Sequence, residues 1–78
     1  MHSKEMLQYI AKSLVDRPDA VKVSDVEGER ALVLELQVAS EDMGKVIGRN
    51  GRVIRAIRSV SKAAAIRDGK MIHVEIVE

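Results

Sequence analysis

Hydrophobic residues recur along this chain with two spacings, one helical and one alternating, and these spacings predict most of its secondary structure. Helical spacing marks roughly the first 15 residues, where a helix with one apolar side is expected to end before Pro18. Alternation from Leu32 to Val38, and again from Met71 to Val77, predicts two strands that each bury one face.

A third strand is expected before residue 27, although its pattern is less regular. Three valines between residues 21 and 26 are its apolar residues, and the change of phase near Ser24 and Asp25 predicts a bulge. Because only Glu27-Gly28-Glu29 separates it from the strand at 32–38, the two are expected to pair as an antiparallel hairpin.

Two helices are expected between the last two strands. Ser40 is placed to cap the first, which is brief and ends at Gly48. The second begins after Gly51 and extends to the neighbourhood of Ile66. Its apolar side is expected to consist of Val53, Ile57, Val60 and Ala64. Its opposite side carries Arg52, Arg55, Ser59 and Lys62. The resulting order, α-β-β-α-α-β, predicts an α+β fold.

Composition excludes several functions. Tyr9 is the only aromatic residue, which argues against folds that stack bases on aromatic side chains. The absence of cysteine excludes disulfides and thiolate metal sites. No apolar run approaches the ~20 residues of a membrane span, so we expect a cytoplasmic protein without a membrane partner.

Charge is distributed unevenly although the net charge is only +1. Residues 43–67 contain seven basic residues and no acidic one, and all twelve carboxylates lie outside this window. Such asymmetry indicates a surface that faces a polyanion.

Gly48 and Gly51 stand at the centre of this basic window and predict a tight connection between the two helices. A backbone without side chains can lie close to a ligand there. The free N–H groups and the positive dipole end of the second helix favour an anion such as phosphate at the same place. Arg49, Arg52 and Arg55 recur every three residues and add charge.

No catalytic or cofactor site is expected. Gly44, Gly48 and Gly51 do not have the spacing of a dinucleotide-binding or P-loop sequence, and they follow a helix rather than a strand. No metal-ligand cluster or nucleophile–base set accompanies them. His73 is expected to be exposed on its strand, and no role is assigned to His2. We therefore expect no enzyme, no cofactor, no metal and no small-molecule substrate.

The segment Val46-Ile47-Gly48-Arg49-Asn50-Gly51-Arg52-Val53-Ile54 resembles the KH-domain signature (V/I)-I-G-x-x-G-x-x-I, with a helix on each side and strands before and after. Further likeness is found at Arg17-Pro18-Asp19, Val38-Ala39, Gly44-Lys45, Ala63-Ala64-Ala65 and Val74-Glu75-Ile76. Over its whole length the chain resembles the small bacterial single-KH-domain proteins of the KhpA family. The resemblance implies a type II KH domain at 1–78, in which a three-stranded sheet packs against three helices. It also implies an N-terminal α-β extension at 1–28, a β-α-α-β core at 30–78 and a G-x-x-G loop at 48–51.

The resemblance also implies a mode of binding, in which the loop clamps the backbone of about four single-stranded nucleotides. Gly48 and Gly51 would approach the phosphates, with Arg49 and Asn50 at the tip of the loop. The other residues that it implicates are Arg52 and Arg55 on the sugar-phosphate chain, Lys45, Ile47 and Ile54 at the border or floor of a groove, and residues 36–38 as its far wall.

KhpA-like proteins are similar in forming homodimers and in acting with a second KH-containing protein, KhpB (also called Jag or EloR). By resemblance, this chain is expected to be an RNA chaperone or post-transcriptional regulator linked to cell elongation and envelope homeostasis. Exposed apolar residues among Ile57, Val60 and Ile66 would serve a partner. Two alternatives stay open, namely a protein-interaction adaptor with a vestigial loop and a binder of single-stranded DNA.

Overall fold

The computed structural model describes residues 3–77, without the side chains of residues 67 and 68. His2 and the side chain of Arg67 therefore fall outside the described residues. The main elements are α1 (Ser3–Leu14), β1 (Lys22–Glu27), β2 (Ala31–Gln37), α2 (Met43–Ile47), α3 (Arg52–Asp68) and β3 (Met71–Val77). Short 3₁₀ turns lie at Pro18–Ala20, Ser40–Asp42 and Arg49–Gly51. The predicted order, α-β-β-α-α-β, is confirmed.

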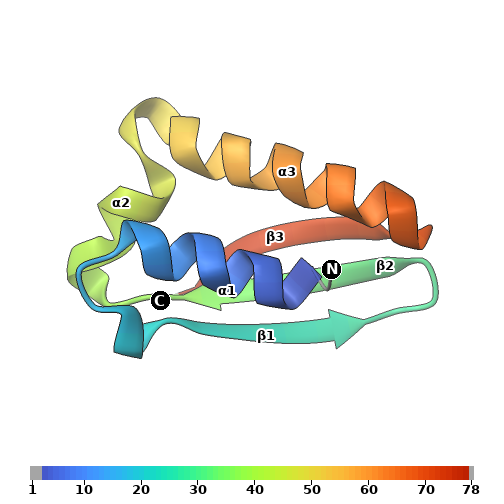
Figure 1. The fold of residues 1–78 in the computed structure, drawn as a ribbon, viewed down its shortest axis with the longest axis horizontal. Coiled ribbons are helices and arrows are strands. Elements are labelled where there is room, and N and C mark those ends of the chain that lie inside the picture. Colours follow the sequence, from blue (N-terminus) through green and yellow to red (C-terminus); the bar gives the residue numbers. More distant parts are fainter. Residues whose placement is uncertain (1–2, 78) are drawn as a thin grey trace.

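The three strands form one mixed sheet in the order β1-β2-β3. β1 and β2 are antiparallel, as predicted from the short turn, whereas β2 and β3 are parallel. Parallel neighbours need a crossover connection, and α2 and α3 supply it. α1 packs against β1 and α3, and α3 packs along β3, so the helices cover one face of the sheet (Figure 1). The predicted three-stranded sheet packed against three helices is thereby confirmed.

The hairpin contains no bulge, so that prediction was wrong. Pairing is continuous from Lys22 opposite Gln37 to Glu27 opposite Leu32. Alternation is therefore kept throughout β1, which places Val26 opposite Val33 on the face that no helix covers. Val26 is accordingly 58% exposed.

The core lies between the sheet and the helices and is built from the alternating residues of the strands. Leu34 and Leu36 on the central strand are completely buried. On α3 the buried positions are Ile54, Ile57, Ser61 and Ala65. Val60, which was predicted to lie on the buried side, is 47% exposed. Helical periodicity fits a buried stripe through Val60 as well as one through Ser61. The packing of α3 on β3 and α1 buries the stripe that contains Ser61.

Among the helices at residues 3–77, none is both long enough and apolar enough to cross a membrane.

Ser61 generates a prediction about stability, because its hydroxyl is buried and has no hydrogen-bond partner. Replacing it with alanine removes this unsatisfied group and improves helix propensity. We expect Ser61→Ala to raise the free energy of unfolding by about 1 kcal/mol, as measured by urea denaturation. Ser59→Ala, at an exposed position of the same helix, controls for propensity. Equal stabilities of the two variants would contradict the prediction.

Candidate nucleic-acid interface

The loop between α2 and α3 is a tight turn made almost entirely by backbone. Gly48 ends α2 and donates its N–H to the carbonyl of Gly44 at 2.9 Å. The turn Arg49–Gly51 follows, closed by an N–H···O bond of 3.1 Å from Gly51 to Gly48. Gly51 then opens α3 in the left-handed conformation, at φ 74°. The predicted helix–loop–helix arrangement is confirmed.

Gly48 is required by close packing as well as by its conformation. Its φ is 76°, where a side chain is strained, and a Cβ at this position would lie 2.4 Å from Cγ2 of Val53 and 2.8 Å from the Val53 nitrogen. The first turn of α3 therefore packs directly on the bare backbone of Gly48. Sequence reasoning assigned Val53 only to an apolar stripe and did not predict this contact.

Asn50 is the one non-glycine residue with positive φ among those described, at φ 56° and ψ 26°. Asparagine and aspartate adopt this left-handed conformation more readily than most other residues. The identity of residue 50 is therefore explained in part by the turn itself.

The side chains predicted for phosphate contact lie at the surface. Arg49, Asn50, Arg52 and Arg55 are all exposed. None of the carboxylates whose side chains the structure describes forms an ion pair with any of these three arginines. No side chain caps α3. The N–H of Arg52 donates to the carbonyl of Arg49 within the turn, and no side chain competes with an anion for the other N–H groups of the first turn.

The two isoleucines predicted as the floor of a groove differ in exposure. Ile54 is only 7% exposed and belongs to the core, whereas Ile47 is partly buried against that core. Both residues therefore support the loop from below. The predicted far wall at 36–38 does not fit, because Leu36 is completely buried on the central strand.

A groove of about 260 Å³ lies instead between α3 and the free edge of β3. Its lining includes Arg58, Lys62, His73 and Val74. Arg58 donates its Nε–H to the carbonyl of Val74 at 3.2 Å. This bond fixes α3 to an unpaired strand edge, and it could not be predicted without knowing that β3 is an edge strand.

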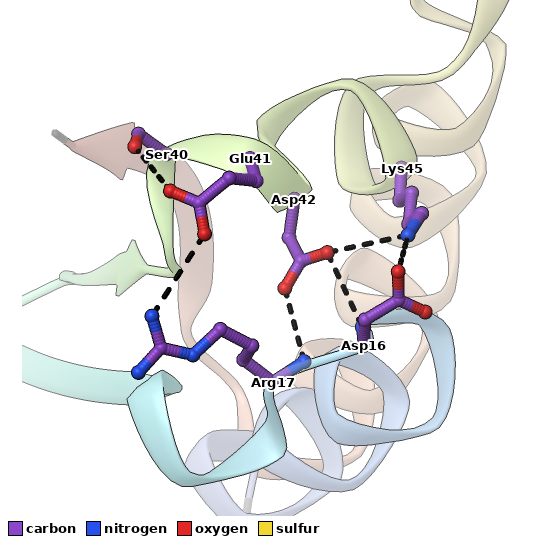
Figure 2. Close-up of polar contacts among 6 residues, drawn as sticks. All are labelled: Asp16, Arg17, Ser40, Glu41, Asp42 and Lys45. Atoms are coloured by element: carbon purple, nitrogen blue, oxygen red, sulfur yellow. Dashed lines mark hydrogen bonds and ion pairs between the residues drawn. The ribbon is translucent and has the colours of Figure 1, made fainter.

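Lys45 is already engaged with two carboxylates in this structure (Figure 2). Its Nζ forms an ion pair with Asp16 and another, at 3.4 Å, with Asp42. The hydrogen bond from Lys45 to Asp16 raises the pKa of the ammonium and outweighs burial, which lowers it. Lys45 is therefore a cation at neutral pH whose charge is shared with acidic neighbours.

Asp42 was missed by sequence reasoning, which expected only Ser40 to cap the helix here. Ser40 makes no capping bond, and its hydroxyl donates to Glu41 at 2.9 Å. Asp42 is 1% exposed and accepts the N–H groups of Asp16 and Arg17 (Figure 2). Burial raises the pKa of its carboxyl, but these two bonds and Lys45 outweigh burial and leave that pKa lowered.

Residues 3–77 bring together no group of three or more potential metal ligands. His73 is exposed on β3, as the alternation predicted. The arrangement is therefore a surface with backbone donors and free guanidinium groups, which suits an extended polyanion.

A mixed three-stranded sheet, three helices on one of its faces, and a basic two-glycine turn between adjacent helices define a type II KH domain. Comparison with known proteins agrees with this class. The profile described as KhpA/KhpB, KH domain, matches residues 4–76. The chain therefore belongs to the KhpA/KhpB family of KH domains, which are binding domains rather than enzymes.

Similar proteins include the RNA-binding protein KhpA of Clostridium acetobutylicum, which is 60% identical over 95% of this chain and 99% of its own length. KhpA of Clostridium perfringens is 57% identical over the same shares. KhpA of Chlamydia trachomatis is 45% identical over 96% of each chain.

Among solved structures, the Aquifex aeolicus protein Era, bound to GDP and aluminium fluoride, superposes with a TM-score of 0.67 and 20% identity. The match covers 95% of this chain but only 29% of Era, so it supports the fold alone. A structure of Era with a nucleotide and a segment of 16S ribosomal RNA gives the same score, with 95% and 28% covered.

The glycines of the loop generate a graded prediction. Gly48→Ala meets Val53 and is also strained by positive φ, so we expect it to destabilise the protein by about 3 kcal/mol. Gly51→Ala has its nearest contact at 3.8 Å, with Ile54, and is expected to cost only the strain, about 1 kcal/mol.

Gly69→Ala is the matched control, because Gly69 has φ 71° and nothing within 4 Å of the added Cβ. Urea denaturation of the three variants measures the series. If Gly48→Ala is as stable as the other two variants, the contact of Val53 with Gly48 does not contribute to stability and the prediction is contradicted.

Proposed function

We propose that this chain binds single-stranded RNA through the loop at Gly48–Gly51. The observation that carries the proposal is the unpaired basic loop, where positive-φ glycines leave the backbone bare beside three exposed arginines. Family membership supports RNA as the ligand, because similar chains across clostridia and chlamydiae carry the name RNA-binding protein KhpA.

Each residue of the proposed site has a physical role. Gly48 and Gly51 allow a phosphate to approach the backbone, and Arg49 and Asn50 lie at the tip of the turn. Arg52 and Arg55 extend the positive surface along the first turns of α3. Ile47 and Ile54 hold this surface rigid from beneath. Lys45 lies at its border, and its two carboxylate partners leave less of its charge for a phosphate.

The groove beside β3 gives the bound chain a direction. On α3, Arg52, Arg55 and Lys62 lie on one side, since they are three and seven residues apart. A single strand clamped at the loop could therefore continue along α3 toward the groove, whose polar lining is Arg58, Lys62, His73 and one carboxylate, Glu75. The exposed edge of β3 there offers backbone groups to bases without requiring an aromatic platform.

Reversing the charge of the loop tests this function. The variant Arg49→Asp with Asn50→Asp keeps a residue at position 50 that tolerates positive φ, so the fold is expected to survive. Fluorescence anisotropy with a labelled RNA of about ten nucleotides, longer than the four that a KH loop clamps, measures binding at two salt concentrations. We expect the wild type to bind, binding to weaken as salt rises, and the variant to lose at least about tenfold in affinity.

The matched control is Ser13→Asp with Lys22→Asp, which changes the net charge by the same three units at exposed positions. Position 22 begins β1, across the molecule from the loop (Figure 1). This control is expected to retain most of its affinity. Equal binding by all three proteins would contradict the loop assignment, and competition with DNA of the same sequence distinguishes the two nucleic acids.

The family relationship also supports finer hypotheses. We propose that residues 1–78 act as one KH unit in the cytoplasm, as an RNA chaperone or post-transcriptional regulator that influences cell elongation and envelope homeostasis. We further propose that this unit pairs with a second copy or with a KhpB-like protein. One clamp for a few nucleotides binds weakly, and joining two clamps raises affinity by effective concentration.

An uncharged strip on α3 is the candidate surface for this pairing. It consists of Ala56, Val60 and Ala63, which are all exposed and share one side of the helix. Val60 and Arg58 are two residues apart and so lie about 160° apart around the helix. The strip and the groove therefore occupy different sides of α3, and pairing leaves the groove open.

Val60→Glu is expected to convert a dimer to a monomer, since a buried unpaired carboxylate opposes association. Sedimentation velocity of the purified protein measures this change. Val26→Glu, at a residue that is 58% exposed on the face of the sheet that no helix covers, is the control and should leave the dimer intact. A monomeric wild type would exclude the second copy as partner, and loss of pairing without loss of RNA binding would separate the two surfaces.

A further inference from the structure

The carboxylate of Asp42 lies inside the molecule, where two segments that are remote in sequence meet, residues 16–17 and residues 42–45. Its Oδ1 accepts the N–H of Asp16 at 3.2 Å, and its Oδ2 accepts the N–H of Arg17 at 3.1 Å. Lys45 Nζ approaches Oδ1 at 3.4 Å. A buried carboxylate is tolerated only when it is paired or hydrogen-bonded, and here both oxygens are used.

Neither backbone donor belongs to the helix that Asp42 precedes. Asp16 and Arg17 lie in the connection between α1 and β1, 26 and 25 residues earlier in the chain. Asp42 makes no capping bond to α2. Its carboxylate therefore ties the beginning of α2 to a distant connection instead of stabilising α2 locally.

α2 is short, and besides the bonds of Asp42 it is held by the packing of Val46 in the core and of Met43 and Ile47 against it. It has five residues, of which only Val46 is buried. A helix of this length has no independent stability in water. Gly48 directly follows Ile47, the last residue of α2, so the position of α2 determines where the loop begins. Figure 2 shows the two anchoring bonds of Asp42 on one side and Lys45, one turn further along α2, on the other.

We propose that Asp42 is a positioning residue for the Gly48–Gly51 loop, which holds α2 against the α1–β1 connection so that the loop keeps its binding geometry. The RNA consequence of this proposal rests on the proposed function, whereas its consequence for the loop itself does not. The N-terminal α-β unit would thereby contribute to binding through Asp42, without touching the ligand.

Asp42→Asn distinguishes positioning from simple electrostatics, because the two explanations predict opposite changes in RNA affinity. The substitution removes a negative charge beside a basic surface, so charge alone predicts tighter RNA binding. An asparagine has a single acceptor oxygen, and its NH₂ group would face one of the two backbone N–H donors. Positioning by Asp42 therefore predicts weaker binding despite the more favourable net charge.

Asp16→Asn is the matched control. The Asp16 side chain is 78% exposed and contacts the same ammonium group of Lys45. Its replacement removes the same charge from the same neighbour but leaves the backbone N–H of residue 16 free to bond Asp42. It is expected to leave the loop geometry unchanged and to bind RNA at least as tightly as the wild type.

Amide hydrogen exchange by NMR reads the loop without RNA. The amides of Gly48 and Gly51 are both hydrogen-bonded within the loop region, and amides of the central strand β2 report on global unfolding. In Asp42→Asn we expect the loop amides to exchange faster by on the order of tenfold. A merely structural role would instead speed exchange of β2 and leave local opening of the loop unchanged.

Fluorescence anisotropy with the labelled RNA gives the second readout. Each substitution is also made in the Ser61→Ala background, so that a destabilised variant can still be examined. We expect Asp42→Asn to lose about fivefold in affinity, within the range by which residues remote from a ligand modulate binding, while Asp16→Asn loses none. The inference is overturned if the loop amides of Asp42→Asn exchange no faster than those of Asp16→Asn. It is also overturned if the wild type binds RNA and the two variants bind it equally.

Failure of the wild type to bind RNA would contradict the proposed function instead, and the exchange experiment would still decide whether Asp42 positions the loop. If Asp42→Asn does not fold even with Ser61→Ala, Asp42→Ser, which removes the charge and keeps a short acceptor, undergoes the same comparison. Unchanged loop exchange in that variant overturns the inference, and faster exchange supports it.

Discussion

Close packing of α3 on the bare backbone of Gly48 is the contact on which the arrangement of the site depends. A parallel pair formed by β2 and β3 needs a crossover, and here α2, the loop and α3 make it within one short stretch of chain. The reversal of direction between α2 and α3 occurs at residues 48–51. Any side chain at Gly48 would separate Val53 from that turn. The same feature that lets two helices meet therefore leaves backbone exposed to a ligand.

Charge in this molecule is organised by the fold rather than by composition. The net charge is +1, yet the arginines at the loop have no acidic partner among the described residues, whereas Lys45 has two. Ion pairs elsewhere, such as Lys4 with Asp25 at 3.3 Å, join α1 to the sheet at exposed positions where they contribute little stability. The result is a protein that is nearly neutral overall and positive where α3 begins.

Two sides of α3 are assigned to different tasks in the proposed function. Arg52, Arg55 and Lys62 lead from the loop to the groove at β3, and the strip around Val60 lies on a different side of the helix from that groove. Pairing of two copies through the strip would leave the groove of each copy open and would increase the number of nucleotide clamps.

The sequence by itself determined the six elements, their order, the hairpin and the loop, because these depend on periodicity, glycine and proline, which act locally. It also determined which arginines stand at the loop. The tertiary structure decided which stripe of α3 is buried, since Ser61 and Val60 fit the helical period equally well. It alone placed Arg58 on the edge of β3 and gave Asp42 its partners at Asp16 and Arg17. Those contacts join residues 16 to 26 positions apart, and no local pattern encodes which distant backbone groups will meet a side chain.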